Sequence, residues 1–142
     1  MLRRADHTRL TPRAALRVLA GVVAIIGPAG LWRYARYQRA RSRVNFSRPP
    51  GSFYVGELDV HPDCRNRGIG GTLLRHAEEV ARREGFARMS LTTSTINPAR
   101  HLYERHGFRV VGTRLDAGYE AITGIPGDVL MVKGMGLAPP GP

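Results

Sequence analysis

The stretch that decides the fold is residues 59–79, DVHPDCRNRGIGGTLLRHAEE. It starts where an alternating apolar segment ends, passes through an Arg-x-x-Gly-x-Gly-Gly turn, and continues as an amphipathic pattern. The first turn of a helix leaves backbone N–H groups without partners, and the helix dipole makes that end partly positive. Such an end binds phosphate readily. The stretch therefore predicts a strand, an anion-binding turn and a helix in succession.

Three glycines and two arginines define the turn. We expect Gly68, Gly70 and Gly71 to let a ligand approach the backbone, because a Cβ there would stand between amide and ligand. The guanidinium groups of Arg65 and Arg67 can each contact phosphate oxygens through two hydrogen bonds. The turn matches neither the P-loop pattern nor the dinucleotide fingerprint Gly-x-Gly-x-x-Gly. A pyrophosphate is the predicted ligand, and a plain helix start with turn glycines is the alternative.

The composition is that of one soluble domain. The chain has 142 residues, of which 42% are apolar, and this length suffices for a hydrophobic core. Cys64 is the single cysteine, which excludes an internal disulfide and a four-cysteine metal site. We therefore expect no metal. A reducing, cytoplasmic location fits this cysteine usage.

The net charge of +11 is concentrated at one end of the chain. Residues 1–52 carry eleven arginines against one acid, whereas residues 53–142 carry ten arginines and Lys133 against ten acids. Clustered positive charge is the electrostatic footprint of nucleic-acid binding. An arginine-only excess nevertheless reflects codon usage in a GC-rich genome more readily than an RNA-binding design. We therefore expect no nucleic-acid partner.

Residues 1–52 are predicted to form a basic, largely helical region with a linker. Residues 12–26 and 29–44 are helical by composition, and Gly27-Pro28 should separate them. The uncharged run 18–32 is shorter than the roughly 20 residues of a membrane span. A packed helix pair is favoured, and the alternatives are a signal peptide or membrane contact through residues 12–43.

Residues 53–134 are predicted to form a second region, and residues 135–142 a flexible tail. An alternating segment at 53–60 and three later segments at 86–93, 108–115 and 129–135 predict strands. The first strand-helix-strand unit implies a parallel pair with a ligand site at its carboxyl end.

Two helices and a loop are expected between these strands. A helix over 70–84 should bury a stripe formed by Leu73, Ala77, Val80 and Ala81. Asn97, followed by proline, should cap a second helix that ends at Gly107. Residues 116–127 are predicted to be a loop.

The order and spacing of several motifs over residues 53–134 resemble the GNAT acetyltransferase superfamily. The motifs are Val60 at a strand end, Arg65-Asn66-Arg67-Gly68-Ile69-Gly70, Asn97-Pro98-Ala99, Leu102-Tyr103 and Gly107-Phe108. The resemblance implies an α/β fold with a mixed central sheet flanked by helices. Residues 1–52 predict helices and no strand pair, so the family's first strands are expected to be missing or altered.

The resemblance also implies acetyl-CoA as the cofactor and assigns residues to it. The implied cofactor-binding residues are Leu58, Asp59 and Val60 beside the pantetheine arm, Arg65, Asn66, Arg67, Gly68, Ile69, Gly70 and Gly71 at the pyrophosphate, and Asn97 near the thioester. Tyr103 would protonate the departing thiolate, a role that typically contributes about 10²–10⁴-fold. Alternatively, Tyr103 is a core residue with its hydroxyl at the rim.

The proton acceptor is the least defined part of the predicted site. An amine must be neutral to attack a thioester, and a fixed backbone N–H, predicted to be that of Val60, would stabilise the resulting oxyanion. Glu57 is our first choice for the base, and Asp59 shares its face of the strand. Both carboxylates could instead be solvated, or could attract a cationic substrate without moving protons.

The predicted function is direct transfer of an acetyl group from acetyl-CoA to an amine. The acceptor would be a small-molecule amine or a protein amine, and a homodimer is left open. One rival is a CoA-binding remnant without turnover, because the front of the fold is altered. The other is a membrane-surface protein anchored by its basic apolar N-terminal region.

Overall fold

The computed structural model describes the backbone of residues 12–136 and the side chains of residues 27–136. Most of the predicted tail at 135–142 therefore lies outside the described residues. The chain divides into two compact units, of which the first ends at Arg39 and the second begins at Ala40. The second unit contains every strand of the described sheet.

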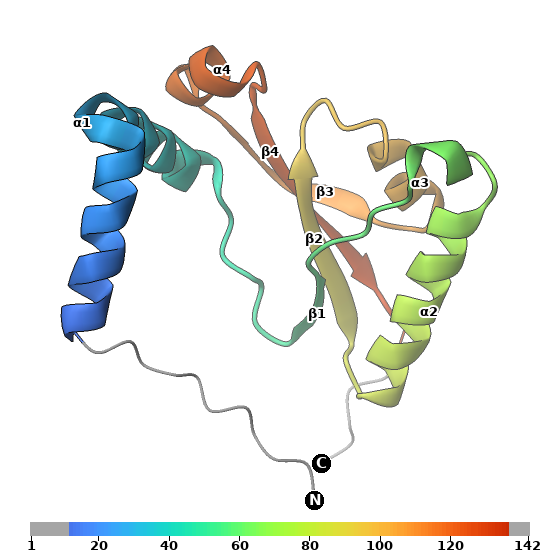
Figure 1. Ribbon diagram of the computed structural model, residues 1–142. Coiled ribbons are helices and arrows are strands. Elements are labelled where there is room, and N and C mark those ends of the chain that lie inside the picture. The colour runs from blue at the N-terminus through green and yellow to red at the C-terminus, as the bar shows by residue number, and fades with distance from the viewer. Residues whose placement is uncertain (1–11, 137–142) are drawn as a thin grey trace, which may run out of the picture. The chain divides into compact units, whose positions relative to one another are not determined.

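The helix α1 (Pro12–Val44) is interrupted in its middle (Figure 1). Gly27 has φ 66° and ψ 172°, which is not helical, and Pro28 follows it. The predicted break between two helical segments is therefore confirmed. Over residues 12–136, none of the helices combines the length and the apolar character that crossing a membrane requires.

Four strands form one mixed sheet in the order β1-β2-β4-β3 (Figure 1). β1 (Ser52–Val55) runs parallel to β2 (Arg88–Ser94), while β4 (Gly127–Gly134) runs antiparallel to both β2 and β3 (Arg109–Leu115). The predicted fold class, a mixed α/β sheet, is confirmed. Between residues 12 and 51 the described backbone contains a helix and no strand, so the family's first strands are absent from that segment.

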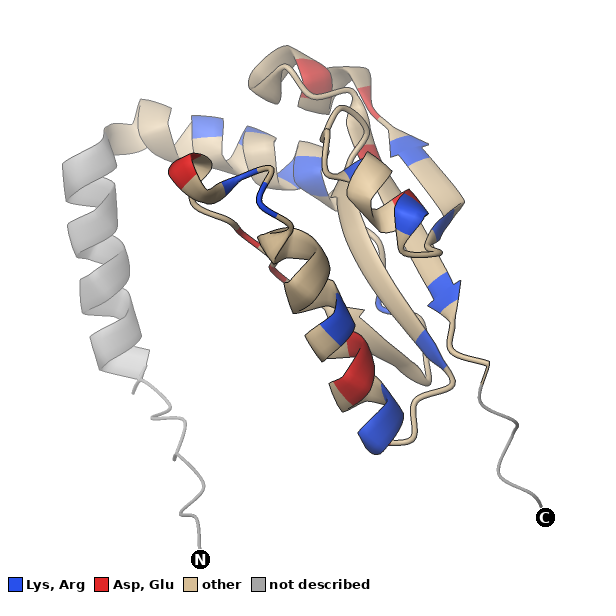
Figure 2. Cartoon of the chain, turned by 90° about the vertical axis from the view of Figure 1, so that its right-hand side faces the viewer, with Lys and Arg blue, Asp and Glu red and all other residues tan. Residues whose placement is uncertain are grey.

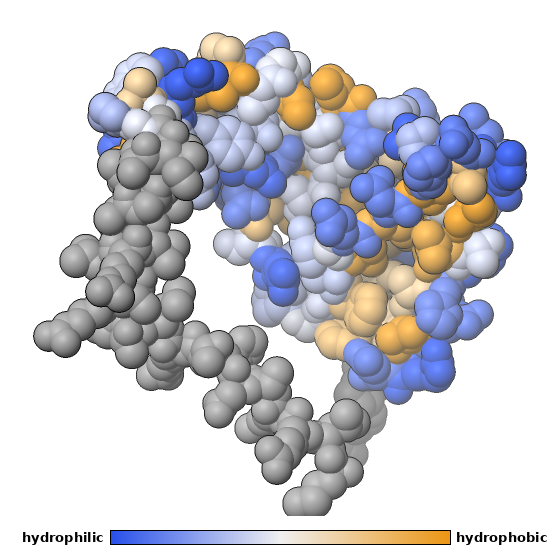
Figure 3. All heavy atoms as spheres, viewed as in Figure 1, coloured by the Kyte–Doolittle hydropathy of each residue, from blue (hydrophilic) through white to orange (hydrophobic). Residues whose placement is uncertain are grey.

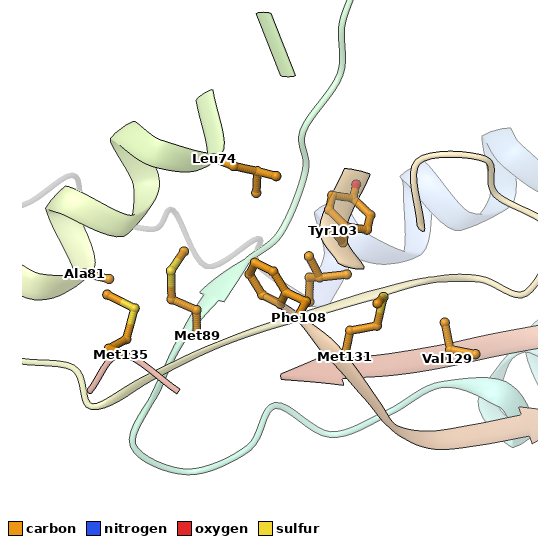
Figure 4. Close-up of a cluster of buried hydrophobic side chains, with 9 residues drawn as sticks. Leu74, Ala81, Met89, Tyr103, Phe108, Val129, Met131 and Met135 are labelled. Carbon is orange, nitrogen blue, oxygen red and sulfur yellow. The ribbon is translucent and has the colours of Figure 1, made fainter. Parts of the chain in front are cut away.

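Two helices pack their apolar side chains on one face of the sheet. α2 (Ile69–Arg83) follows the short 3₁₀ helix η1 (Pro62–Cys64), and α3 (Arg100–Arg105) follows β2. Figure 4 shows the core that they share with the strands. The cluster consists of Leu74, Ala81, Met89, Leu91, Tyr103, Phe108, Val129, Met131 and Met135.

The predicted inner stripe of α2 is confirmed for Ala81, which is buried, and for Ala77, which packs against the core, but it is wrong for Leu73. Leu73 is 41% exposed, whereas Leu74 is 2% exposed and lies in the core. Gly71 is also buried, because α2 turns its smallest residues toward α3. Adjacent residues of a helix point about 100° apart. The side chain of Leu74 therefore points into the core, while that of Leu73 stays at the surface. In Figure 3, which has the view of Figure 1, apolar residues are visible among hydrophilic ones on the right, where α2 lies.

The first strand is shorter than predicted. β1 ends at Val55, whose partner is Leu91, and not at residue 60. β2 continues to Ser94 and remains paired with β4. After Gly56 the chain leaves the ladder, and the side chains of Leu58 and Val60 turn toward α2. The residues that follow β1 therefore have main-chain groups outside the sheet.

The predicted loop at 116–127 contains a helix, α4 (Ala117–Thr123). The carboxylate of Asp116 accepts a hydrogen bond of 2.8 Å from the Tyr119 N–H, which caps the first turn. Gly124 ends the helix with φ 73°. These two caps stabilise seven residues whose composition alone is typical of a loop.

The last turn of α1 belongs to the unit that contains the sheet. Ala40 and Val44 are buried there. Arg41 forms an ion pair with Asp128 of β4, and Arg43 lies 3.2 Å from the carboxylate of Asp116. The buried Asp128 carboxylate, with 7% of its side chain exposed, is thus neutralised by a residue far away in sequence. Figure 2 shows how acidic and basic residues are distributed over the chain.

Candidate functional site

A pocket of about 770 Å³ lies between the segment that follows β1, the start of α2 and α3. Its wall is built from two parts of the chain that are distant in sequence, one within residues 58–71 and the other within residues 97–105. The lining residues are Leu58, Asp59, Val60, Cys64, Arg65, Asn66, Gly68, Ile69, Gly70, Gly71, Asn97, Pro98, Ala99, His101, Leu102, Tyr103 and Arg105.

The structure gathers most of the predicted site residues around this pocket. Of the predicted cofactor-binding residues, all except Arg67 line it, and so does Tyr103. Arg67 is exposed outside the lining. Glu57, our first choice for the base, is likewise exposed and does not line the pocket, whereas Asp59 does.

The turn before α2 presents main-chain donors to the pocket. Gly68 caps the helix with φ 79°, and Asn66 also has a positive φ of 60°. The Thr72 N–H donates to the Gly68 carbonyl at 3.0 Å and starts the helical hydrogen bonds. The N–H groups of residues 69–71 precede this bond and have no backbone acceptor among the described residues. These donors suit an anion at a helix N-terminus.

The glycines of the turn serve two different purposes. Gly68 requires its positive φ, and a Cβ there would meet nothing within 4 Å. A Cβ on Gly70 would instead lie 2.9 Å from Leu102 Cδ2, and a Cβ on Gly71 would lie 3.1 Å from His106 Nε2. The interpretation that a Cβ here would stand between amide and ligand stays a prediction, and Gly70 and Gly71 have a packing role beside it. These two residues allow α2 and α3 to pack closely.

The segment after β1 turns two apolar side chains toward α2. A Cβ on Gly70 would lie 4.0 Å from Leu58 Cδ2 and 3.9 Å from Val60 Cγ2, so both side chains face α2. The Val60 carbonyl accepts a hydrogen bond of 3.2 Å from Arg65 Nε. This bond joins the segment to the turn and fixes one pocket arginine.

Tyr103 brings a phenol to the pocket wall. The residue is 7% exposed, and its ring contacts that of Phe108 edge-on with 6.2 Å between centroids. Burial raises the pKa of the Tyr103 hydroxyl, and the negative charge of Asp59 raises it further. The phenol is therefore protonated at neutral pH and can donate a hydrogen bond or a proton.

Asn97 shapes the entrance to α3. Its Oδ1 accepts from the Ala99 N–H at 2.9 Å, and its Nδ2 donates to Thr93 Oγ1 at 2.8 Å. The Arg100 N–H donates to the Asn97 carbonyl at 3.1 Å. The regular helix begins at Arg100 and not directly after Asn97 as predicted, because Asn97 caps a separate turn.

Sequence reasoning missed Thr93 and His106, which shape this site, and named Leu102 only as part of a motif. The Thr93 hydroxyl accepts a hydrogen bond from the Asn97 side chain. The side chains of Leu102 and His106 pack against the two glycines of α2. The alternation of β2 could have placed Thr93 on the face of Met89 and Leu91. The two contacts of α3 depend on how the helices meet, which no local pattern in the sequence reports.

Among the described side chains, no cluster of three His, Cys, Asp or Glu residues is arranged to hold a metal ion. The side chains of the lining include two guanidinium groups, those of Arg65 and Arg105, the His101 imidazole and one carboxylate, that of Asp59. Such a wall suits a ligand with phosphate at one end.

Comparison with protein families and known proteins identifies the class of this fold. Residues 14–108 match the model of the Acetyltransferase (GNAT) family. Streptothricin acetyltransferase of Streptomyces lavendulae is 39% identical over 59 residues, which cover 41% of this chain and 31% of that protein.

Solved structures agree with the family match. Nourseothricin acetyltransferase has a TM-score of 0.52 and 30% identity, with 65% of this chain and 55% of that chain covered. The ribosomal-protein-S18-alanine N-acetyltransferase of Escherichia coli has a TM-score of 0.50 and 27% identity, with 61% and 57% covered.

This chain belongs to the GNAT acetyltransferase family, since the family model matches more than half of its residues. The match begins at residue 14 and therefore includes most of α1, which lies before the region whose motifs resemble the family. The chain spans 31% of the curated relative and 55% of nourseothricin acetyltransferase.

Proposed function

We propose that this protein transfers an acetyl group from acetyl-CoA to an amine. One observation carries the proposal. A single pocket joins unpaired helix N–H groups and an arginine to a protonated, buried phenol. The first set suits a diphosphate, and the phenol suits a leaving group that needs a proton.

The residues of the pocket fit coenzyme A along its length. The N–H groups of residues 69–71 and the Arg65 guanidinium would hold the diphosphate. The main chain of residues 58–60, which is outside the sheet, and the Asn97 carboxamide would bind the amide groups of the pantetheine arm. Acetyl-CoA would supply the acetyl group as a reactive thioester.

Tyr103 would hold a proton next to the sulfur. Because its pKa is raised by burial and by Asp59, the hydroxyl keeps its proton at neutral pH. It can then protonate a thiolate as that group leaves, which typically contributes about 10²–10⁴-fold to the rate. The Val60 N–H would donate to the oxygen that gains negative charge, as predicted from the sequence.

We assign the proton acceptor to Asp59 in place of Glu57. Leu58 and Val60 face α2, and Asp59, which lies between them in the sequence, lines the pocket. Asp59 lines the pocket near Tyr103, whereas Glu57 is exposed outside the lining. The Asp59 carboxylate would attract a cationic amine and accept its proton before attack.

An antibiotic amine is the first acceptor class to test. Two of the similar proteins are named for streptothricin and nourseothricin, and a cationic acceptor would complement Asp59. A protein amine is the second class. We place the activity in the cytoplasm because the sequence has one cysteine, Cys64, which fits a reducing compartment.

A CoA-binding protein without turnover is the second candidate function. It is favoured by the described backbone of residues 12–51, which contains a helix where the family resemblance would place the first strands. In that case the pocket would still bind CoA, but the site for the acceptor amine would be incomplete.

The deciding experiment combines calorimetric titration with CoA and an assay of thiol release from acetyl-CoA. The assay uses streptothricin, nourseothricin, polyamines and a peptide with a free N-terminus as acceptors. Binding with release above the rate without enzyme supports the transferase, and binding without release supports the second candidate. A folded protein that gives no heat and no thermal stabilisation with CoA excludes both.

A further inference from the structure

The hydrogen bonds around Asn97 fix the orientation of its carboxamide. A backbone N–H can only donate, so the atom that faces the Ala99 N–H at 2.9 Å must be the oxygen Oδ1. The NH₂ group then faces Thr93 Oγ1 at 2.8 Å, and the threonine hydroxyl accepts this hydrogen bond. The chemistry of the two partners therefore determines which end of the amide points each way.

This orientation leaves part of the carboxamide available to a ligand. An NH₂ group can donate twice and an amide oxygen can accept twice. Among the described residues, the Asn97 side chain uses one donor on Thr93 and one acceptor position on Ala99. Asn97 also lines the pocket. It can thus offer one donor and one acceptor to a group that contains an amide.

Thr93 is well placed to hold this orientation. It is 9% exposed, lies on the central strand β2 and is paired with Val129 of β4. Its β-branched side chain has restricted rotation at χ1. The hydroxyl is therefore a fixed acceptor, unlike one on a mobile loop.

We propose that Thr93 is a positioning residue that holds the Asn97 carboxamide in the orientation that binds the pantetheine arm of coenzyme A. This inference rests on the proposed function, since it takes coenzyme A as the ligand. Without the hydroxyl, the carboxamide loses its partner on β2 and can rotate away. The diphosphate end is bound by the turn before α2 and would not depend on Thr93.

The test compares two ligands on matched variants. Thr93→Val removes the hydroxyl and keeps the shape of the side chain, and Thr93→Ser keeps the hydroxyl. Thr113→Val is the control, because this threonine is exposed on β3. Each protein is titrated by calorimetry with CoA and with ADP, which carries a diphosphate but no pantetheine arm.

We expect Thr93→Val to weaken CoA binding by about 5–10-fold, which corresponds to one hydrogen bond. Its affinity for ADP should stay within about twofold of that of wild type. ADP has no pantetheine arm, so it does not use the hydrogen bonds of Asn97 that the substitution weakens. Thr93→Ser should restore the affinity for CoA. Unchanged CoA binding in Thr93→Val would overturn the proposal, as would equal losses for CoA and ADP or a Thr93→Ser variant as weak as Thr93→Val.

A replacement variant and the wild-type titrations cover the remaining outcomes. If Thr93→Val does not fold, Thr93→Ala is measured instead, with the same difference between ligands expected. If wild-type protein binds neither CoA nor ADP, the proposed function fails. If wild type binds CoA and the threonine variants match it, only the role of Thr93 fails.

Discussion

Gly70 of α2 lies so close to Leu102 of α3 that a Cβ on the glycine would stand 2.9 Å from the leucine Cδ2. The Arg-x-x-Gly-x-Gly-Gly turn is thus also a packing element. It holds the helix that carries the main-chain donors against the helix that carries Tyr103. Both residues of this contact line the pocket.

Gly70→Ala should destabilise the protein, because the added methyl overlaps Leu102. Overpacking of this kind typically costs about 1–3 kcal/mol in the free energy of unfolding. Urea unfolding measures the change. Gly134→Ala is the control, since its Cβ would meet nothing within 4 Å and its φ is not positive. Equal stability of the two variants would show that Leu102 gives way without cost.

Tyr103→Phe should reduce turnover without weakening the coenzyme complex. The loss of a proton donor lowers kcat by about 10²–10⁴-fold, while the ring still packs against Phe108. Steady-state kinetics and calorimetry with CoA measure the two quantities. Tyr54→Phe serves as the control on β1. If kcat of Tyr103→Phe equals that of wild type, the phenol is only a packing residue.

Arg65→Gln should weaken CoA binding more than Arg67→Gln does. Arg65 lines the pocket, whereas Arg67 does not. A hydrogen bond to a charged group contributes about 1.5–3 kcal/mol, which corresponds to roughly 10–150-fold in Kd. Calorimetry at two salt concentrations should show a smaller salt effect for Arg65→Gln. Equal losses in the two variants would argue against a direct contact by Arg65.

Asp59→Asn should change the pH profile of kcat/KM, whereas Glu57→Gln should not. Removing the carboxylate removes the proposed proton acceptor, a role that typically contributes about 10²–10⁴-fold to the rate. The Asp59 charge also raises the pKa of Tyr103, so the basic limb of Asp59→Asn should move to lower pH. Rates are measured across the stable range of each variant. A profile altered in Glu57→Gln alone would return the base to Glu57.

His106 should make stability depend on pH below neutrality. Burial lowers its pKa first, and the charges of Lys133 and Arg75 lower it further, while Glu78 opposes them. The folded state therefore binds the proton less readily than the unfolded state. The free energy of unfolding should then fall as the pH drops below about 6.5, the ordinary value for histidine.

His106→Gln should flatten this pH dependence, and His76→Gln, an exposed change on α2, should not. Urea unfolding between pH 7.5 and pH 5 provides the comparison. An identical slope in wild type and His106→Gln would assign the pH dependence to other groups.

Local patterns predicted the order of the elements from residue 53 onward. Alternation and caps located each strand and the helix after the turn, and the short motifs correctly indicated the GNAT family. The helix α4 was missed, although Asp116 and Gly124 are ordinary caps. Seven residues between two such caps carry too little apolar periodicity to be distinguished from a loop.

The errors at the site arise from tertiary contacts. Leu73 and Leu74 are equally apolar, and only the approach of α3 to Gly70 and Gly71 decides which of them is buried. Glu57 and Asp59 share one face of an ideal strand, and which of them accepts the proton stays a prediction. The early end of β1 at Val55 removes both from the ladder, and Asp59 alone reaches the pocket wall.

The ion pair between Arg41 and Asp128 limits how this protein can be shortened or fused for laboratory use. A variant that starts after the last turn of α1 would leave the Asp128 carboxylate buried on β4 without its guanidinium partner. It would also lack Ala40 and Val44, which are buried, and would expose the surface that they cover. A shortened variant should therefore keep the last turn of α1 and start upstream of Ala40.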